Sequence, residues 1–116
     1  MIFPKALEEL IEEFKKLPGV GRKTAERYAL HIINKLDKEE VHQFSQALSE
    51  AKDKLHHCSV CGNLTDEEVC SICKDELRDQ STILVVENVK DVFSIEKASQ
   101  YRGLYHVLNG VLSPME

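Results

Sequence analysis

Apolar residues in the first third of the chain recur at the spacing of an amphipathic helix. Between Pro4 and Lys16 they fall at i, i+3, i+4 and i+7, and they are Leu7, Leu10, Ile11 and Phe14. Pro4 suits a first helical turn, where its missing N–H costs nothing, and Pro18-Gly19 ends the pattern. We therefore expect a helix with one apolar stripe.

A second helix is expected from about Gly21 to Lys35, and a third follows it. The second turns five residues inward, which are Ala25, Tyr28, Ala29, Ile32 and Ile33. Asp37 with Glu40 three residues later is typical of a capping box, which opens the third helix. The third helix carries the apolar residues Val41, Phe44, Leu48, Ala51 and Leu55.

The pattern changes after residue 55. Residues 56–78 hold few large apolar side chains and all four cysteines, so this segment cannot build a hydrophobic core of its own. Further on, "TILVVE" is typical of a buried parallel strand, residues 92–100 of a short helix, and "LYHVL" of a second strand. Together they predict one βαβ unit, whose two-stranded sheet is too small to cover both faces.

Composition places the chain among folded proteins, since 42% of its 116 residues are hydrophobic and 30% are charged. No apolar run approaches the roughly 20 residues that a membrane helix needs. The N-terminus is acidic where a signal peptide is basic and apolar, so we expect a cytoplasmic protein.

The net charge of −5 argues weakly against nucleic acid as a partner, but the charge is unevenly distributed. Residues 1–36 hold seven basic and five acidic side chains, whereas residues 37–116 hold eight and fifteen. Between Lys15 and Arg27 there are five basic side chains and one acidic one. A local basic patch of this kind is what phosphate binding needs.

The stretch "LPGVGRKTA" predicts a glycine-rich hairpin between the first two helices. Its glycines permit positive φ angles and remove side chains, and the free N–H groups of the next helix then form an anion site. We expect a DNA phosphate to bind there without regard to sequence. The residues of this site are Gly19, Gly21, Arg22, Lys23, Thr24 and Arg27, with Lys23 and Arg27 on one helix face. The alternative is a plain helical hairpin whose glycines only tighten the turn.

The four cysteines form two Cys-x2-Cys pairs separated by eight residues. Four thiolates in a tetrahedron suit one structural zinc ion, and the ligands are Cys58, Cys61, Cys70 and Cys73. Redox dithiols and an iron–sulfur centre are the alternatives. His57 could replace a ligand but is more simply a surface residue. We expect removal of the metal to unfold this segment.

Glu87 ends the first predicted strand, and Asp91 follows four residues later. Carboxylates at this position can hold Mg²⁺ for phosphoryl transfer. One or two acids make an incomplete two-metal site, so the plainer interpretation is that Glu87 caps or orients a loop.

Taken in order, three stretches resemble the RecR family of bacterial recombination mediators. They are "LPGVGRKTAERYALHII", which also resembles the helix-hairpin-helix motif of DNA repair proteins, "CSVCGNLTDEEVCSICKDELRD" and "ILVVENVKDVFSIEKASQYRGLYHVLNGVLSP". Arg78-Asp79 and residues 101–114 are close to family signatures. The resemblance implies an α+β protein of several parts: a helix-hairpin-helix domain at 1–55, a four-cysteine zinc finger at 56–79 and the start of an α/β Toprim domain at 80–116.

The resemblance also implies a function. Members of this family are not known as enzymes, and they work with RecO and RecF to load RecA onto gapped or single-stranded DNA. By carry-over Lys23 and Arg27 contact DNA, whereas Glu87 and Asp91 stand in the region thought to contact RecO. The expected protein is a non-enzymatic DNA-binding scaffold for recombinational repair, bacterial and associated with the nucleoid.

The sequence ends at "SPME", where family members continue. We expect an N-terminal fragment that ends within the Toprim domain and dimerises through its N-terminal helices, while the tetrameric ring belongs to the full-length chain. Two other function classes remain open. One is a Mg²⁺-dependent phosphoryl-transfer enzyme of Toprim type, which the missing Asp-x-Asp pair disfavours, and the other is a zinc-dependent protein-interaction module without DNA contact.

Overall fold

The computed structural model describes residues 2–110, which divide between a first compact unit ending at Glu50 and a second beginning at Ala51. The last part of the predicted Toprim stretch, residues 111–116, lies outside the described residues. The two domain boundaries expected after residues 55 and 79 stay predictions.

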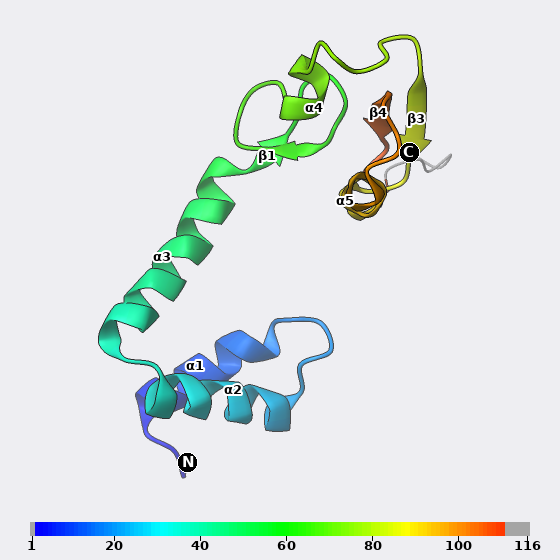
Figure 1. Cartoon of the computed structure of the whole chain (residues 1–116). Coiled ribbons are helices and arrows are strands. Elements are labelled where there is room, and N and C mark those ends of the chain that lie inside the picture. The colour runs from blue at the N-terminus through cyan, green and yellow to red at the C-terminus, as the bar shows by residue number, and fades with distance from the viewer. Residues whose placement is uncertain (1, 111–116) are drawn as a thin grey trace. The chain divides into compact units, whose positions relative to one another are not determined.

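The first unit is built on two helices packed side by side, α1 (Lys5–Lys15) and α2 (Arg22–Lys35), as Figure 1 shows. Their shared core is small and consists of Ile11 with Ala25 and Ala29, all without solvent exposure. Two alanines on α2 let α1 approach closely, and five larger residues surround the contact: Phe3, Leu7, Leu10, Phe14 and Val20. The predicted stripe of α1 is thus confirmed as the face that packs on α2.

The third helix, α3 (Lys38–Lys54), begins at the predicted capping box. The Glu40 amide donates to the Asp37 carboxylate at 2.8 Å, and the Asp37 amide donates to the Glu40 carboxylate at 3.0 Å. Nothing on α3 is buried, and the apolar residues Val41, Phe44 and Leu48 are exposed.

One part of the expected core is wrong. The spacing on α2 predicts that Tyr28 and Ile33 face inward, but they are 41% and 61% exposed. Ala25 and Ala29 form the face of α2 that packs on α1. Within the described part of the chain, no further element covers the remaining apolar residues of α2. Helical spacing identifies an apolar stripe wider than the face that α1 covers.

The second unit starts with the cysteine-rich segment. A short antiparallel pair, β1 (His56–His57) and β2 (Leu64–Thr65), is followed by the single turn α4 (Ser71–Lys74). The apolar cluster here consists of the cysteines with Val69 and Ile72. A segment with so little aliphatic surface needs another source of stability, as its sequence indicates.

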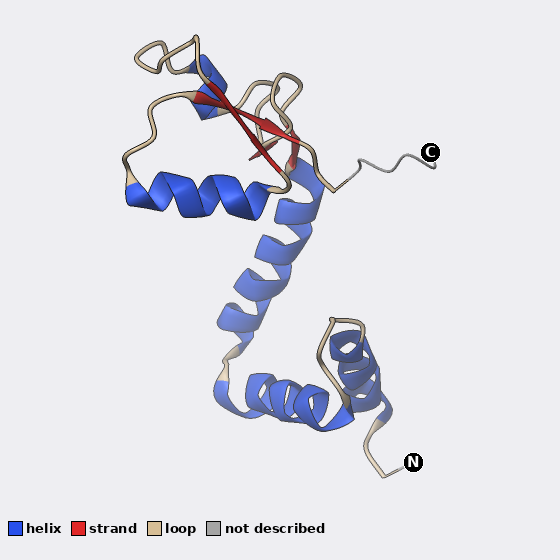
Figure 2. Ribbon diagram, turned by 90° about the vertical axis from the view of Figure 1, so that its right-hand side faces the viewer, coloured by secondary structure: helices blue, strands red, loops and turns tan. Residues whose placement is uncertain are grey.

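The rest of the second unit is the predicted βαβ unit. Strand β3 (Ile83–Val86) pairs in parallel with β4 (Leu104–Val107), and α5 (Val89–Ala98) connects them. Figure 2 shows α5 running along one side of this strand pair. Its core on that side contains the buried residues Val92, Tyr105 and Val107. The α+β class and the parallel strand pairing are confirmed.

Two details of the βαβ unit differ from expectation. Helix α5 begins earlier than residue 92 because the Asn88 side chain accepts from the Lys90 amide at 3.0 Å and Asp91 completes a capping box. Strand β3 is not buried, since Ile83 and Val85 are 60% and 57% exposed. Among the described residues only one face of the sheet has a helix on it, so the other face of the apolar run remains open.

Among residues 2–110, no helix is both long and apolar enough to span a membrane.

Candidate metal centre and nucleic-acid interface

The two glycines of the hairpin have different roles. Gly19 has φ +79°, a conformation that favours glycine, whereas Gly21 has φ −86° and ψ −177° and forms the N-cap of α2. Gly21 therefore does not use the positive φ that glycine permits. A Cβ atom at either position would meet nothing within 4 Å. Neither the backbone conformation of Gly21 nor the packing around it requires glycine. The lack of a side chain there leaves the start of α2 open to an incoming group.

Arg22, the first residue of α2, is engaged with carboxylates of its own unit. Its Nη2 atom lies 2.6 Å from Glu8 Oε1 on α1, its Nε atom lies 2.7 Å from Glu26 Oε2, and Nη1 lies 3.4 Å from Glu12 Oε2. These bonds raise the pKa of Arg22, and the hydrogen bond from Arg22 lowers the pKa of Glu8. Arg22 thus links α1 to α2, and its charge is compensated.

Lys23 and Arg27 are different, because both are exposed and neither makes an ion pair with a described residue. The Arg27 guanidinium lies 5.5 Å from the centre of the Tyr28 ring, which in turn meets Phe14 edge-on at 5.8 Å. The first turn of α2 holds no acidic residue and receives no side-chain cap, while Thr24 is half-buried within it. Uncompensated cations beside uncapped helix amides form a surface that suits an anion.

The four cysteines converge on one point although they come from two segments. Their sulfur atoms all lie within 4.8 Å of one another. The Cys58 and Cys73 sulfurs are 3.9 Å apart, and those of Cys61 and Cys70 are 3.6 Å apart. Zn–S bonds of about 2.3 Å give a tetrahedron with edges of about 3.8 Å, so the spacing fits zinc.

Backbone amides complete the surroundings of the sulfurs. Cys58 Sγ accepts from the Val60 and Cys70 amides at 3.4 and 3.3 Å, and Cys61 Sγ accepts from the Asn63 amide at 3.4 Å. Gly62 has φ +85°, so the first knuckle uses a turn that glycine permits. Amide donors of this kind favour thiolate over thiol, which is the form that binds a metal.

Protonation of the cluster depends on what fills it. Burial raises the pKa of Cys58, but the surrounding amides outweigh burial and lower that pKa to about 6. Burial raises the pKa of Cys61 to about 11, and burial together with neighbouring thiols raises that of Cys73. Four thiolates cannot share this small volume without a cation, so a divalent metal must displace protons as it binds.

The other predicted chemical residues are not part of this centre. His57 Nδ1 lies 3.0 Å from the Gly62 carbonyl oxygen, and among the described residues the only group of three or more close metal-ligating side chains is the four cysteines. The Asp91 carboxylate accepts from the Asn88 amide at 3.3 Å within the cap of α5, and Glu87 is exposed. Capping, the role considered above for Glu87, is thus observed for Asp91, four residues later.

Three protein-family models match the chain in succession. The helix-hairpin-helix model of RecR matches residues 7–52, the four-cysteine zinc finger domain model of RecR matches residues 55–75, and the Toprim domain model matches residues 81–116. The Recombination protein RecR of Lacticaseibacillus casei (strain BL23) is 54% identical over 116 residues, and that of Enterococcus faecalis (strain ATCC 700802 / V583) is 53% identical. These alignments cover 100% of this chain and 58% of each relative.

The chain belongs to the RecR family. A third member, the Recombination protein RecR of Streptococcus mutans serotype c (strain ATCC 700610 / UA159), is 55% identical over 99% of this chain and 57% of the relative. The chain thus spans somewhat more than half the length of the RecR proteins that it matches. The zinc-finger model covers the four cysteines and agrees with the sulfur geometry.

The structure also gives a role to two stretches whose role the sequence did not reveal, Arg78-Asp79 and the segment before β4. Arg78, 9% exposed, pairs with the Glu96 carboxylate and donates to the Gly103 carbonyl at 3.0 Å. The Asp79 amide donates to the Arg102 carbonyl at 2.7 Å. A Cβ atom on Gly103 would lie 2.8 Å from the Thr82 backbone carbonyl oxygen and would also meet the Tyr101 ring, so this position requires glycine. The two stretches therefore interlock and stabilise the second unit.

Proposed function

We propose that the chain is a non-catalytic DNA-binding scaffold in recombinational repair, acting with RecO and RecF to load RecA onto gapped or single-stranded DNA. The observation that carries the DNA-binding part is the division of charge on α2. Arg22 is neutralised by Glu8 and Glu26, whereas Lys23 and Arg27 stay free of carboxylates in the described chain, beside an open, uncapped helix start. The relatives are named recombination proteins, which supports the same role.

The proposed DNA contact is to the phosphate backbone and uses no base readout. Lys23 and Arg27 supply charge, the α2 amides beyond Gly21 supply hydrogen bonds, and Gly19 shapes the loop. Thr24 and Arg22 flank the contact, with Arg22 holding α1 in place. Such binding is sequence-independent and weakens with salt, because each neutralised phosphate releases counterions.

The test compares two double variants that each remove two positive charges from the first unit. Lys23→Ala with Arg27→Ala changes the hairpin end of α2, whereas Lys5→Ala with Lys35→Ala changes the start of α1 and the end of α2. Fluorescence anisotropy with labelled single-stranded and gapped DNA, measured over a salt series, should give a slope of log K against log salt that is about 2 smaller for the first variant only. Equal loss in both variants, or no loss in either, would refute the hairpin as the contact site.

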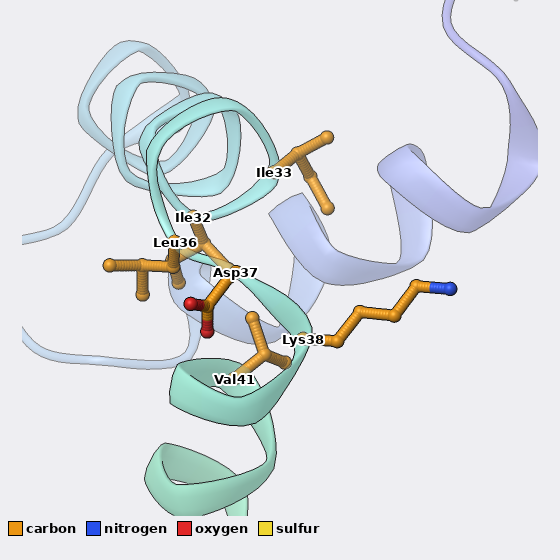
Figure 3. Close-up of a pocket in the computed structure, with 6 residues that line it drawn as sticks. All are labelled: Ile32, Ile33, Leu36, Asp37, Lys38 and Val41. Atoms are coloured by element: carbon orange, nitrogen blue, oxygen red, sulfur yellow. The ribbon is translucent and has the colours of Figure 1, made fainter.

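Self-association is part of the proposal. The first unit exposes a run of apolar side chains on α2 and α3, which are Leu30, Ile33, Val41, Phe44 and Leu48. Two of them, Ile33 and Val41, also line a pocket of about 280 Å³ where α2 meets α3, together with Ile32, Leu36, Asp37 and Lys38 (Figure 3). Exposed apolar patches of this kind mark protein interfaces, and we infer a dimer of this chain and a tetrameric ring for the longer protein.

Sedimentation measures this interface. Phe44→Glu with Leu48→Lys should shift a dimeric chain to the monomer mass, while Leu77→Lys should leave the mass unchanged, because Leu77 is 86% exposed but stands in the second unit. A dimer that survives the α3 variant would contradict the assignment of this surface.

The proposal assigns no catalytic role to Glu87 and Asp91, which are the candidate contacts to RecO. Asp91 is committed to the α5 cap, so a phosphoryl-transfer site would have to use a carboxylate that already holds the backbone. Binding of RecO to Glu87→Gln, with Glu76→Gln as the control, tests the contact. Mg²⁺-dependent cleavage of DNA that disappears in Glu87→Gln would replace the scaffold by an enzyme.

A further inference from the structure

The first cysteine knuckle lies along the edge of β4 that β3 does not occupy. On one edge, the Leu104 and Leu108 amides donate to the Thr82 and Val86 carbonyls of the β3 segment at 2.8 and 2.9 Å. The Val107 amide, one residue out of phase with these, donates instead to the Cys61 carbonyl at 2.7 Å. The second edge of the strand is thus paired with the metal-binding loop.

The contact between knuckle and strand is tight. The Asn109 side-chain amide donates to the Gly62 carbonyl at 3.1 Å. A Cβ atom on Gly62 would lie 2.7 Å from the Val107 carbonyl oxygen and 3.1 Å from Asn109 Nδ2, closer than the strand can accommodate without moving. Gly62 is therefore required twice, by its positive φ and by the approach of β4.

Two more contacts join the finger to the βαβ unit. Ile72, between the last two cysteines, packs both on the cysteine cluster and on the core of Val92, Tyr105 and Val107. At the end of the finger, Arg78 reaches Glu96 on α5 and the Gly103 carbonyl just before β4. The finger thus contacts β4 or its flanking residues near both ends of the strand.

We propose that the metal-bound knuckle is the edge cover of β4, so that β4 stays ordered only while the four cysteines hold their metal. An unpaired strand edge exposes N–H and C=O groups to solvent or to another strand, and native sheets cover such edges. The knuckle can hold its backbone in place only when its sulfurs are tethered, because it has little apolar surface of its own. Loss of metal then uncovers β4 as well as the finger.

The first test follows amide hydrogen exchange in the whole chain of residues 1–116, loaded with zinc and then treated with EDTA. Zinc release is confirmed independently by elemental analysis. We expect exchange of residues 104–108 to accelerate about tenfold or more, together with that of the finger, while α1 and α2 keep their protection. Exchange at 104–108 that stays at the zinc-loaded rate after the metal has left would overturn the proposal.

The second test separates the docking contact from backbone strain while the cysteines stay intact. Gly62→Ala and Gly110→Ala both place alanine at positive φ, +85° and +68°, but only the Cβ of the first meets β4. With zinc bound, Gly62→Ala should speed exchange of the Val107 amide about tenfold more than Gly110→Ala does. Equal rates in the two variants would contradict the docking contact.

A third variant keeps the test decisive if Gly62→Ala fails to bind metal. Asn109→Gly suits φ +56° and removes only the bond to Gly62. It should raise Val107 exchange several-fold, with the thiolate absorption of the Co²⁺-substituted protein unchanged. Val107 exchange at the wild-type rate in Asn109→Gly would show that the knuckle does not hold the strand.

Discussion

Replacing Arg78 by methionine tests the interlock that stabilises the second unit. Methionine fills a similar volume but removes the guanidinium, whose side chain is 7% exposed. Glu96 then loses its cation, and the Gly103 carbonyl loses its donor. Glu96 keeps the Tyr105 hydroxyl, which donates to it at 2.6 Å.

The size of the effect follows from burial. Removing one partner of a buried ion pair costs about 3–5 kcal/mol, because the other charge is left without compensation. The Glu96 side chain is 29% exposed and keeps one hydrogen bond, so we expect the lower end, about 3 kcal/mol. Glu96→Gln keeps the shape and one hydrogen-bonding oxygen, but it leaves the more deeply buried Arg78 charge with only the Asp75 carboxylate at 3.9 Å, so its cost should also be about 3 kcal/mol.

The dependence on pH gives the prediction a sign. The hydrogen bond from Arg78 is the main cause that lowers the pKa of Glu96, with the Tyr105 hydroxyl adding to it and burial opposing. A carboxylate with a lowered pKa stabilises the fold above its unfolded pKa of about 4.3, and this stabilisation disappears as pH falls through the folded pKa. The difference between wild type and Arg78→Met should therefore be full at pH 7 and shrink below about pH 4.

Urea unfolding of the zinc-loaded chain measures these energies. Near-ultraviolet circular dichroism reports on the second unit through Tyr101 and Tyr105, which meet edge-on at 5.1 Å, when Tyr28 of the first unit is replaced by phenylalanine in every protein compared. Lys74→Met is the control, because it breaks a similar pair with Glu67 in which both side chains are about half exposed, and it should have little effect. If Arg78→Met lowers the free energy of unfolding by less than about 1 kcal/mol, the reasoning is wrong. The same holds if the double variant Arg78→Met with Glu96→Gln costs as much as the two single variants added together, because interacting residues should not be additive.

Three further predictions concern single residues. Gly19→Ala should destabilise the first unit by about 1 kcal/mol in urea, because alanine is strained at φ +79°. Gly21→Ala should cost less, because φ −86° is open to alanine and only the preference of the N-cap position for glycine is lost. Asn88→Ala removes the side-chain acceptor of the α5 cap and should lower stability by about 1 kcal/mol, with an unchanged helix content at 25 °C. Hydrogen bonds from Ser81 and Thr82 lower the pKa of Asp79 to about 2, so carbon-13 NMR should show its carboxyl group titrating near that pH. The ionised carboxylate stabilises wild type above about pH 4, and this stabilisation disappears as the pH falls towards 2. Asp79→Asn should therefore be less stable than wild type above about pH 4, and the difference should vanish near pH 2.

Local signals in the sequence predict most of the elements. Two Cys-x2-Cys pairs predict one cluster because each pair needs only its own turn to place two sulfurs together. Asp37 and Glu40 predict the start of α3 for the same reason, since a capping box is closed within four residues. Asn88 and Asp91 have that same spacing, yet the expected start of α5 at residue 92 is too late, because an acid after a strand also suits a metal or partner contact.

Features that depend on distant parts of the chain are not predictable in this way. The pairing of Arg78 with Glu96 joins residues 18 apart, and it requires α5 to lie on the correct face of β4. The exposure of Ile33 depends on how much of α2 the small helix α1 can cover, which spacing along α2 does not reveal. Periodicity shows that a face is apolar, but it does not show whether the same chain or another one covers it.

The arginines of this chain show why a count of basic residues is a poor guide to an anion site. Arg22 and Arg27 stand on one helix, five residues apart, within the same basic patch. Arg22 meets three carboxylates and holds α1 against α2, so its charge is compensated inside the unit. Arg27 meets an aromatic ring, which orients the guanidinium without neutralising it. The proposed phosphate contact needs the second kind of arginine, whereas the first kind holds the two helices of the hairpin together.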